Sequence, residues 1–532
     1  MDPDLYAQRL IAHYLKQHRL NDTLRAFEIE VNRKFDTDSI DESLTVLVKD
    51  YLEFQGLESS AEHHRVGSNG ESEGVLPIKA SAALNTTHSN NSVLTMEQQR
   101  LIEDRQISID YWTVRCPEKK TKLDLFQKTL VIFSNVDHVT LDGEVRTVGL
   151  FSTSSRSVCI YDLENRQVLV RGENLGGRSP VKAMACIPGT AYVLICSMNG
   201  NLSISAVKKD ANSGDYSISS IGKGVSLHRK LITSVAYRSF GLGSGYFCSL
   251  GWDCRLVVCK VANENTDSPE LINVGSVVLP TQGTCVTVLR DDELELPVVL
   301  VGRVDSSFVH VFTVCKRKNN TGDGTDIQHN ESIVELAKLS LNDSEFSSHV
   351  FHPMAITQSS RGVVSVATSH TPYLRVVTFA LPSVREMLSK APSVVDSCSK
   401  SDSSTLLCEL RRMCQKGTDD RLNPNVPVMR NVIVSNFSGM TPQDRFSTPV
   451  LMSRPSGRSG IWVVGNDGLI RGFDLRIGKV VETIRAHEGR IKTVSAGYLT
   501  GEGHNEVIVS CGAVDLSLIH ICRCRRYSLC RS

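Results

Sequence analysis

The chain has 532 residues, of which 41% are hydrophobic and 22% charged, as is typical of a folded globular protein. With 59 basic and 58 acidic residues the formal net charge is +1, which does not favour binding to nucleic acid or to an anionic membrane. No stretch approaches the roughly 18 apolar residues that cross a bilayer, and the N-terminal MDPDLYAQR is not a signal peptide. The sixteen cysteines are scattered through apolar stretches, which indicates reduced thiols and an intracellular protein, cytoplasmic or nuclear.

Residues 5–31 contain two apolar stripes at helical spacing, separated by the polar segment KQHRLND. Two helices this short cannot bury their own apolar faces. A unit below about 40 residues normally needs a metal, disulfides or a second copy to be stable. We therefore predict that this segment forms a homodimer. The residues expected at the dimer interface are Leu10, Ile11, Tyr14, Leu15, Leu20, Leu24 and Phe27.

The same segment carries an apolar pair, a Tyr-Leu pair, a turn, a Thr-Leu pair and then Phe and Glu: Leu10-Ile11, Tyr14-Leu15, Thr23-Leu24, Phe27 and Glu30. This pattern resembles the LisH motif over residues 5–32, and we assign the helical hairpin to residues 1–34. The resemblance implies a four-helix dimer. The alternative is an ordinary helical hairpin that packs on the rest of the chain.

Two further segments precede the large domain. Ser39 and Glu42 form a capping box, which predicts an additional helix over 35–56 that extends the module. From 57 to 100 the composition changes to Ser, Gly, Asn, Glu and His. Such a segment buries too little apolar surface to fold, so we predict a flexible linker.

From residue 101 to 515 short apolar and β-branched runs recur between Gly, Asn and Asp turns, as in TLVIFSNV, AYVLICS and GVVSVATS. Groups of these runs repeat at roughly 40 to 45 residues, which favours the blades of a propeller. The predicted fold is therefore mainly β, with roughly seven blades behind a small α-helical module. The segment PEKKTKLDLFQKTLVIFSNV can supply a strand that closes the ring. An insertion is expected at about 382–430, where VREMLSKAP and STLLCELRRMCQKG predict helices on the blade rim.

The clearest repeat is SGIWVVGNDGLIRGFDLRIGKVVETIRAHEG, with a turn at Asp467, an aromatic-Asp pair ending at Asp474, and His487. It resembles a WD repeat, and weaker matches contain His228, Asp253 and Asp162. A turn Asp, an edge His and a polar residue between them can form a buried hydrogen-bonded set. We therefore assign six residues to the blade framework and none to catalysis: Asp162, His228, Asp253, Asp467, Asp474 and His487.

The C-terminal SLIHICRCRRYSLCRS shows no strand alternation, although a propeller must complete its last sheet. We predict that residues 516–532 are not native sequence and arise from a frameshift or read-through. The spacing of His520, Cys522, Cys524 and Cys530 fits no common zinc knuckle, so neither a metal nor another cofactor is expected.

Nothing in the sequence requires catalysis, since the chain contains no P-loop, nucleophile elbow or H-E-x-x-H. We predict a non-enzymatic scaffold or adaptor that self-associates and binds other proteins on its propeller, with neither membrane nor nucleic acid as partner. Similar layouts occur in ubiquitin ligase assemblies, transcriptional corepressors, splicing factors and microtubule-motor regulators. The alternatives are a nucleic-acid-binding propeller and an enzyme that uses the propeller channel.

Overall fold

The computed structural model describes residues 8, 11–16, 20–31 and 34–35 and, with short gaps, residues 100–522. The longer gaps are 36–99, 113–118, 317–330, 343–350 and 391–425. The chain divides into two compact units, Met1–Val93 and Leu94–Ser532. The helix predicted over 35–56 and the linker predicted over 57–100 therefore lie almost wholly outside the described residues.

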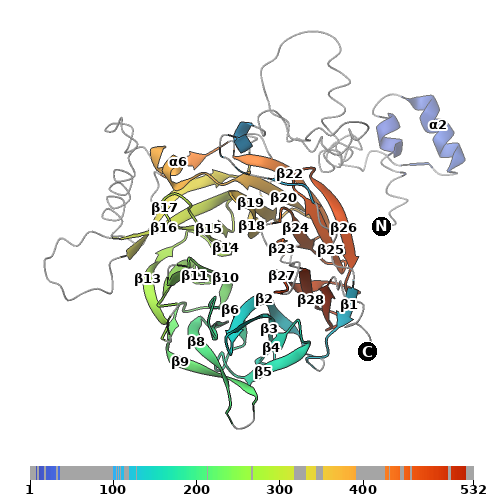
Figure 1. The fold of residues 1–532 in the computed structure, drawn as a ribbon. Helices are drawn as coiled ribbons and strands as arrows, with labels where there is room; N and C mark the ends of the chain where they lie inside the picture. The colour runs from blue at the N-terminus through green and yellow to red at the C-terminus, as the bar shows by residue number, and fades with distance from the viewer. Residues whose placement is uncertain are drawn as a thin grey trace. The chain divides into compact units, whose positions relative to one another are not determined.

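The Leu94–Ser532 unit contains seven sheets arranged as blades around a central opening (Figure 1), which confirms the predicted mainly β propeller of seven blades. From the innermost strand outward, blade 1 comprises β2 (Val131–Leu141), β3 (Glu144–Thr153), β4 (Ser157–Asp162) and β5 (Gln167–Glu173). Blade 2 comprises β6 (Val181–Cys186), β7 (Tyr192–Ser197), β8 (Asn201–Lys209) and β9 (Tyr216–Ser226). Blade 3 comprises β10 (Ile232–Ser239), β11 (Ser244–Gly251), β12 (Arg255–Ala262) and β13 (Glu270–Val278).

The remaining blades follow in chain order. Blade 4 comprises β14 (Gly283–Arg290), β15 (Pro297–Arg303), β16 (Phe308–Lys316) and β17 (Glu331–Ser340). Blade 5 comprises β18 (Pro353–Ser360), β19 (Val363–Thr368), β20 (Tyr373–Ala380) and β22 (Ile433–Pro442). Blade 6 comprises β23 (Val450–Ser453), β24 (Ile461–Val464), β25 (Leu469–Asp474) and β26 (Lys479–Arg485). Blade 7 comprises β27 (Ile491–Tyr498), β28 (Glu506–Gly512), β29 (Leu518–Cys522) and β1 (Lys119–Lys122).

Blade 7 closes the ring with strands from both ends of the domain. The outermost strand β1, from the segment proposed for this role, pairs antiparallel with β29, and β29 pairs with β28. The expectation that the tail holds no strand is thus corrected for Leu518–Cys522, because these residues supply the third strand that β28 requires. Whether residues 516–532 are native stays a prediction, and 523–532 lie outside the described residues.

The hydrophobic core is divided into seven clusters, one between each pair of adjacent blades. Each blade therefore has both faces covered. This explains why central strands such as β15 and β24 are largely unbroken apolar runs and do not alternate between apolar and polar residues. The eight described cysteines that are free lie mostly in these clusters, whereas Cys315 is disulfide-bonded, contrary to the expectation of reduced thiols.

The predicted insertion lies between the third and fourth strands of blade 5. Its first predicted helix is α6 (Val384–Ser389), which begins at the capping residue Ser383 and packs Val384, Met387 and Leu388 into the core between blades 4 and 5. Near its end, β21 (Val428–Met429) pairs parallel with β17 as a fifth strand of blade 4. Both elements therefore contribute to the propeller. The second predicted helix lies outside the described residues.

A segment before β1 is also attached to the propeller. Arg105 donates to the carbonyl of Ala380 at 2.6 Å and pairs with Glu386 at 2.9 Å. Further on, Ile109 is buried in the core between blades 5 and 6, and the backbone N–H of Trp112 donates to Asp474 at 2.7 Å. The described part of this segment thus belongs to the Leu94–Ser532 unit.

Candidate functional site

In the Met1–Val93 unit, residues 11–16 are helical and α2 spans Asn21–Glu30. Among the described residues of this unit only Ala12 and Leu15 are buried, and α2 contains no buried residue. The predicted interface residues Tyr14, Leu24 and Phe27 are half-buried. Ile11 and Leu20 are 38% and 45% exposed, and Leu10 lies outside the described residues. Most of the predicted stripe therefore remains accessible within this unit.

Within the propeller, the structure brings two of the predicted framework residues together in blade 3. His228 lies in the loop before β10, and Asp253 lies in the turn between β11 and β12. Their contact, from Nδ1 to Oδ1, is 2.9 Å, while His228 Nε2 lies 2.9 Å from Ser249 Oγ on β11. The imidazole is buried and bonded at both nitrogens, so it orients the loop against the turn.

Blade 7 repeats this arrangement with different partners from those the repeat suggested. His487 Nδ1 lies 2.9 Å from Asp515, and Nε2 lies 3.0 Å from Ser510 on β28. Asp467 does not contact His487 but binds Arg471 in its own hairpin. The physical reason is that His487 lies in the loop between β26 of blade 6 and β27, the innermost strand of blade 7. From this loop its side chain contacts residues of blade 7 and not of the blade 6 repeat that precedes it.

Ser249, Ser510 and the glycine two residues after each were not among the residues predicted from the sequence. A Cβ atom on Gly251 would lie 2.5 Å from His228 Nδ1 and 2.6 Å from the Asp253 carboxylate. A Cβ on Gly512 would collide with Asp515 in the same way. The recurring pattern Ser-x-Gly followed by Asp, in SLGWD and SCGAVD, is the signal that identifies both sets.

Asp162 and Asp474 occupy equivalent turns after the third strand of blades 1 and 6. One oxygen of Asp162 accepts the backbone N–H groups of Glu164 and Asn165 at 3.0 and 2.8 Å. Asp474 accepts from Arg476 and the next residue in the same way. Both carboxylates are buried, and they shape the turns by satisfying backbone donors.

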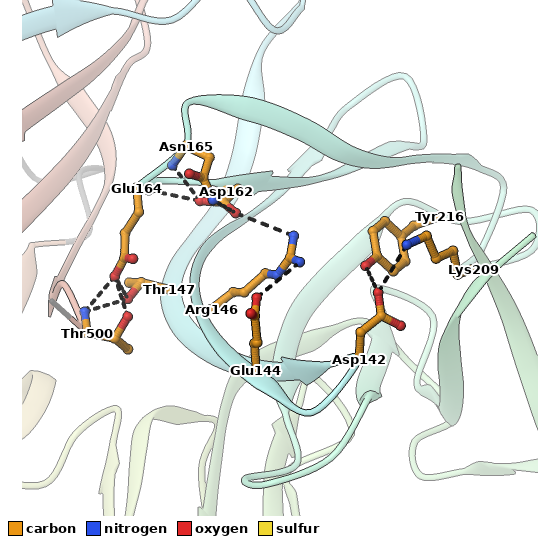
Figure 2. Close-up of polar contacts among 10 residues, drawn as sticks. All are labelled: Asp142, Glu144, Arg146, Thr147, Asp162, Glu164, Asn165, Lys209, Tyr216 and Thr500. Atoms are coloured by element: carbon orange, nitrogen blue, oxygen red, sulfur yellow. Dashed lines mark hydrogen bonds and ion pairs between the residues drawn. The ribbon is translucent and has the colours of Figure 1, made fainter. Parts of the chain in front are cut away.

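A network of polar side chains fastens blade 1 to both neighbouring blades (Figure 2). Asp142, in the turn between β2 and β3, accepts from Tyr216 of blade 2 at 2.5 Å and pairs with Lys209 at 3.3 Å. The hydrogen bond from Tyr216 lowers the pKa of Asp142. On the other side, Glu164 accepts from the backbone N–H of Thr500, next to blade 7, at 2.6 Å. These contacts join separate blades, which is a structural role.

One further cluster has the composition of a catalytic triad. His310 Nδ1 lies 2.8 Å from Glu335 Oε1, and Ser306 Oγ lies 3.3 Å from His310 Nε2. However, Arg303 Nε donates to His310 Nε2 at 2.9 Å, so the lone pair that would take the Ser306 proton is occupied. The cluster is buried within blade 4, and its geometry is that of a structural hydrogen-bond chain.

Two properties of the described residues concern metal binding and membrane insertion. Among them, no three His, Cys, Asp or Glu side chains converge in a way that could hold a metal ion. In the same part of the chain, no helix is both long and apolar enough to span a bilayer.

Comparison with known proteins agrees with the fold. A family described as UCP007778, beta-propeller domain, matches residues 96–514 of the chain. The uncharacterized protein YGR117C of Saccharomyces cerevisiae is 23% identical over 349 residues. This similarity covers 62% of the present chain and 61% of the yeast protein, so the chain spans about three fifths of that relative.

Proposed function

The chain belongs to this beta-propeller family, and we propose that it is a non-enzymatic scaffold or adaptor of the cytoplasm or the nucleus. It self-associates through an N-terminal LisH-type hairpin and binds other proteins on a WD-repeat-like propeller. Its place is within a larger complex, of the ubiquitin ligase, corepressor or microtubule-motor regulator type.

The observation that carries the proposal is the apolar face of the N-terminal helices, which is only partly covered within its own unit. Leu24 and Phe27 lie on one side of α2, and no residue of α2 is buried within its own unit. Ile11 and Leu20 add exposed apolar surface on the preceding helical turn and at the start of α2. A unit of this size buries too little apolar surface to be stable alone, and packing this stripe against the same stripe of a second copy supplies the missing buried surface.

Two features support the binding role of the propeller. The hydrogen-bonded sets around His228 and His487 each combine His, Ser and Asp, as expected for a WD-repeat-like blade. Because these bonds fix the loops that lead into the innermost strands, the loops form a rigid binding surface. Two such surfaces joined in a dimer gain avidity for a partner that is itself multivalent.

Light scattering of the full chain tests self-association, and the wild type is expected to be a dimer. The double variant Leu24→Asp/Phe27→Asp should be a monomer with an unchanged β-rich circular dichroism spectrum, because two charges cannot be buried in an apolar interface. Ile29→Asp is the matched control, since Ile29 is 79% exposed and lies outside the predicted stripe, and it should remain a dimer. A monomeric wild type would overturn the proposal.

A further inference from the structure

A ring of bulges surrounds one end of the central channel. In six of the seven blades the register of the innermost strand shifts at its second residue, which has no cross-strand partner. These unpaired residues are Ile132, Lys182, Thr233, Thr284, Met354 and Lys492. An innermost strand is paired on one side only, so its free edge, which includes the extra residue, borders the central opening (Figure 1).

The two threonines show where this ring lies. Thr233 donates to the carbonyl of Gly283 at 2.9 Å, and Thr284 donates to the carbonyl of Pro353 at 2.5 Å. Each acceptor is the first residue of the innermost strand in the next blade. The bulged residues therefore line the inner wall, at the end where the loops enter the innermost strands.

Two of the bulged residues are lysines, and they come from blades 2 and 7 on either side of blade 1. Lys182 is half-buried and Lys492 is exposed, and neither ammonium group has an ion-pair partner among the described residues. Burial lowers the pKa of Lys182, and the charge of Lys492 lowers it further. The pKa of Lys492 is lowered by burial and then by Arg490. The charges of the two lysines, one on each side of blade 1, therefore repel each other, and no carboxylate among the described residues forms an ion pair with either.

The loops that lead into the same strands add further positive charge. Four basic residues on them are exposed or half-buried and form no ion pair within the described part of the chain: Arg178, Arg229, Lys230 and Arg490. Of the carboxylates on this side of blades 3 and 7, Asp253 and Asp515 already bind histidines, while Glu488 is exposed. The part of the channel mouth formed by blades 7, 2 and 3 therefore carries more basic than acidic side chains, although the net charge of the chain is only +1.

Apolar groups lie beside these cations. Trp252 is 54% exposed and Leu231 is 40% exposed, and the backbone N–H of Trp252 donates to the carbonyl of Leu231 at 2.9 Å. The equivalent bond in blade 2 joins Met198 to Pro180, two residues before Lys182, and Ile232 donates to the carbonyl of Met198 at 3.0 Å. These backbone hydrogen bonds connect the start of blade 2 to the exposed Trp252 and Leu231 of blade 3.

We propose that this channel mouth, over blades 7, 1, 2 and 3, binds an acidic peptide segment of a partner protein. Carboxylates of the peptide would pair with Lys182 and Lys492, and a large apolar side chain would pack on Trp252 and Leu231. The inference rests on the proposed partner-binding function and names its site and partner chemistry.

A peptide fits this surface better than a nucleic acid does. A nucleic-acid backbone carries phosphates in a continuous row, whereas the cationic positions of blades 2 and 7 are separated by Leu130 and Ile132 of blade 1, both half-buried. Acidic and large apolar side chains alternating along an extended chain match this arrangement.

Selection of short random peptides displayed on phage against the full chain tests the proposal. The enriched peptides should combine Asp or Glu with a large apolar residue. Labelled synthetic copies of these peptides should bind the variant Lys182→Gln/Lys492→Gln at least about tenfold more weakly than the wild type. A tenfold change in Kd is what the loss of about one charge-assisted hydrogen bond produces. The variant Trp252→Ala should also bind the same peptides more weakly than the wild type, because it lacks the apolar surface of the indole ring. The matched control Lys208→Gln/Lys223→Gln removes two exposed lysines from β8 and β9 and should bind as the wild type does.

Enriched peptides without acidic residues, or equal binding by both lysine pairs, would overturn the proposal. Tighter, lysine-dependent binding of a single-stranded oligonucleotide would overturn it in favour of a nucleic-acid site. Affinity purification separates this failure from failure of the proposed function. Partners recovered equally by the wild type and by Lys182→Gln/Lys492→Gln would reject only this docking site, whereas a wild type that recovers none would reject the binding role itself.

Discussion

Arg454 and Glu506 form an ion pair of 2.8 Å between blades 6 and 7, and both side chains are almost completely buried. The other carboxylate oxygen of Glu506 accepts Trp462 Nε1 at 2.7 Å. The guanidinium group of Arg454 lies over the ring of Trp112, 3.7 Å from its centroid. A single carboxylate thus connects two blades with the segment that precedes the first strand.

We predict that Glu506→Gln destabilises the propeller by about 3 to 5 kcal/mol, because it leaves a buried guanidinium without its counter-charge. Urea denaturation followed by circular dichroism measures the change. Asp292→Asn is the control, since the pair between Asp292 and Arg361 is exposed on both sides and should cost about 1 kcal/mol or less. Equal losses in the two variants would contradict the prediction.

The hydrogen bond between His228 and Asp253 should appear as energetic coupling. In a double-mutant cycle with alanine at both positions, we expect a coupling energy of about 0.5 to 3 kcal/mol, since each residue orients the other. A second cycle that combines His228 with Asp467 should be additive, because Asp467 belongs to the blade 6 hairpin and binds Arg471. Coupling of similar size in both cycles would mean that the substitutions act by general unfolding.

Asp137 on β2 should make the propeller more stable in mild acid. Burial raises the pKa of Asp137 to about 6, despite the hydrogen bonds it accepts from Cys186 and His138. The folded state therefore holds this proton more tightly than the unfolded state, whose pKa is near 3.8. Its contribution is complete below about pH 4 and is lost as the pH rises through 6.

Melting temperatures measured between pH 4 and 7 test this prediction, with Asp137→Asn as the comparison. The pKa of His138 is lowered by burial, so that residue acts in the opposite direction and both chains must be compared at each pH. The wild type should gain stability relative to Asp137→Asn as the pH falls from about 7 to 4. A constant difference would contradict the assignment.

Removing residues 1–93 should leave the propeller folded, because the chain divides at Val93 and the segment that contacts blades 5 and 6 lies after it. The expected product is a monomer with a β-rich circular dichroism spectrum. Aggregation of this fragment would indicate that the helical unit covers part of the propeller. A dimeric fragment would place self-association outside the helices.

The C-terminal residues are predicted to differ in the natural transcript. Although β29 pairs with β28 and β1, neither ring nitrogen of His520 has a hydrogen-bond partner within the described residues. Burial lowers the pKa of His520 to about 4. Native cores seldom leave such groups unsatisfied, and the family match ends at residue 514. Sequencing a full-length transcript should show a departure near residue 516, and an in-frame match to these residues would contradict the prediction.

The propeller could be predicted from the sequence because two local features specify it: buried apolar strands, and turns that recur at a regular spacing. Apolar β-branched runs such as those of β15 and β24 are buried on both faces, and turns between them recur at the length of a blade. The strand that closes the ring was also found, since its residues lie immediately before the first blade. The pairing of His487 was not predictable from its own repeat, because the partner is chosen by which blade the loop covers.

The sequence by itself determined the local elements: the helical stripe that contains Leu15 and Phe27, the strands, and the turns shaped by Asp162 and Asp474. Only the tertiary structure decided which distant residues meet. Lys182 and Lys492 lie more than half the chain apart, and their proximity follows from the closure of the ring, which places blade 7 next to blade 1. Local patterns reflect backbone preference and burial, whereas a shared channel mouth depends on the curvature of all seven blades together.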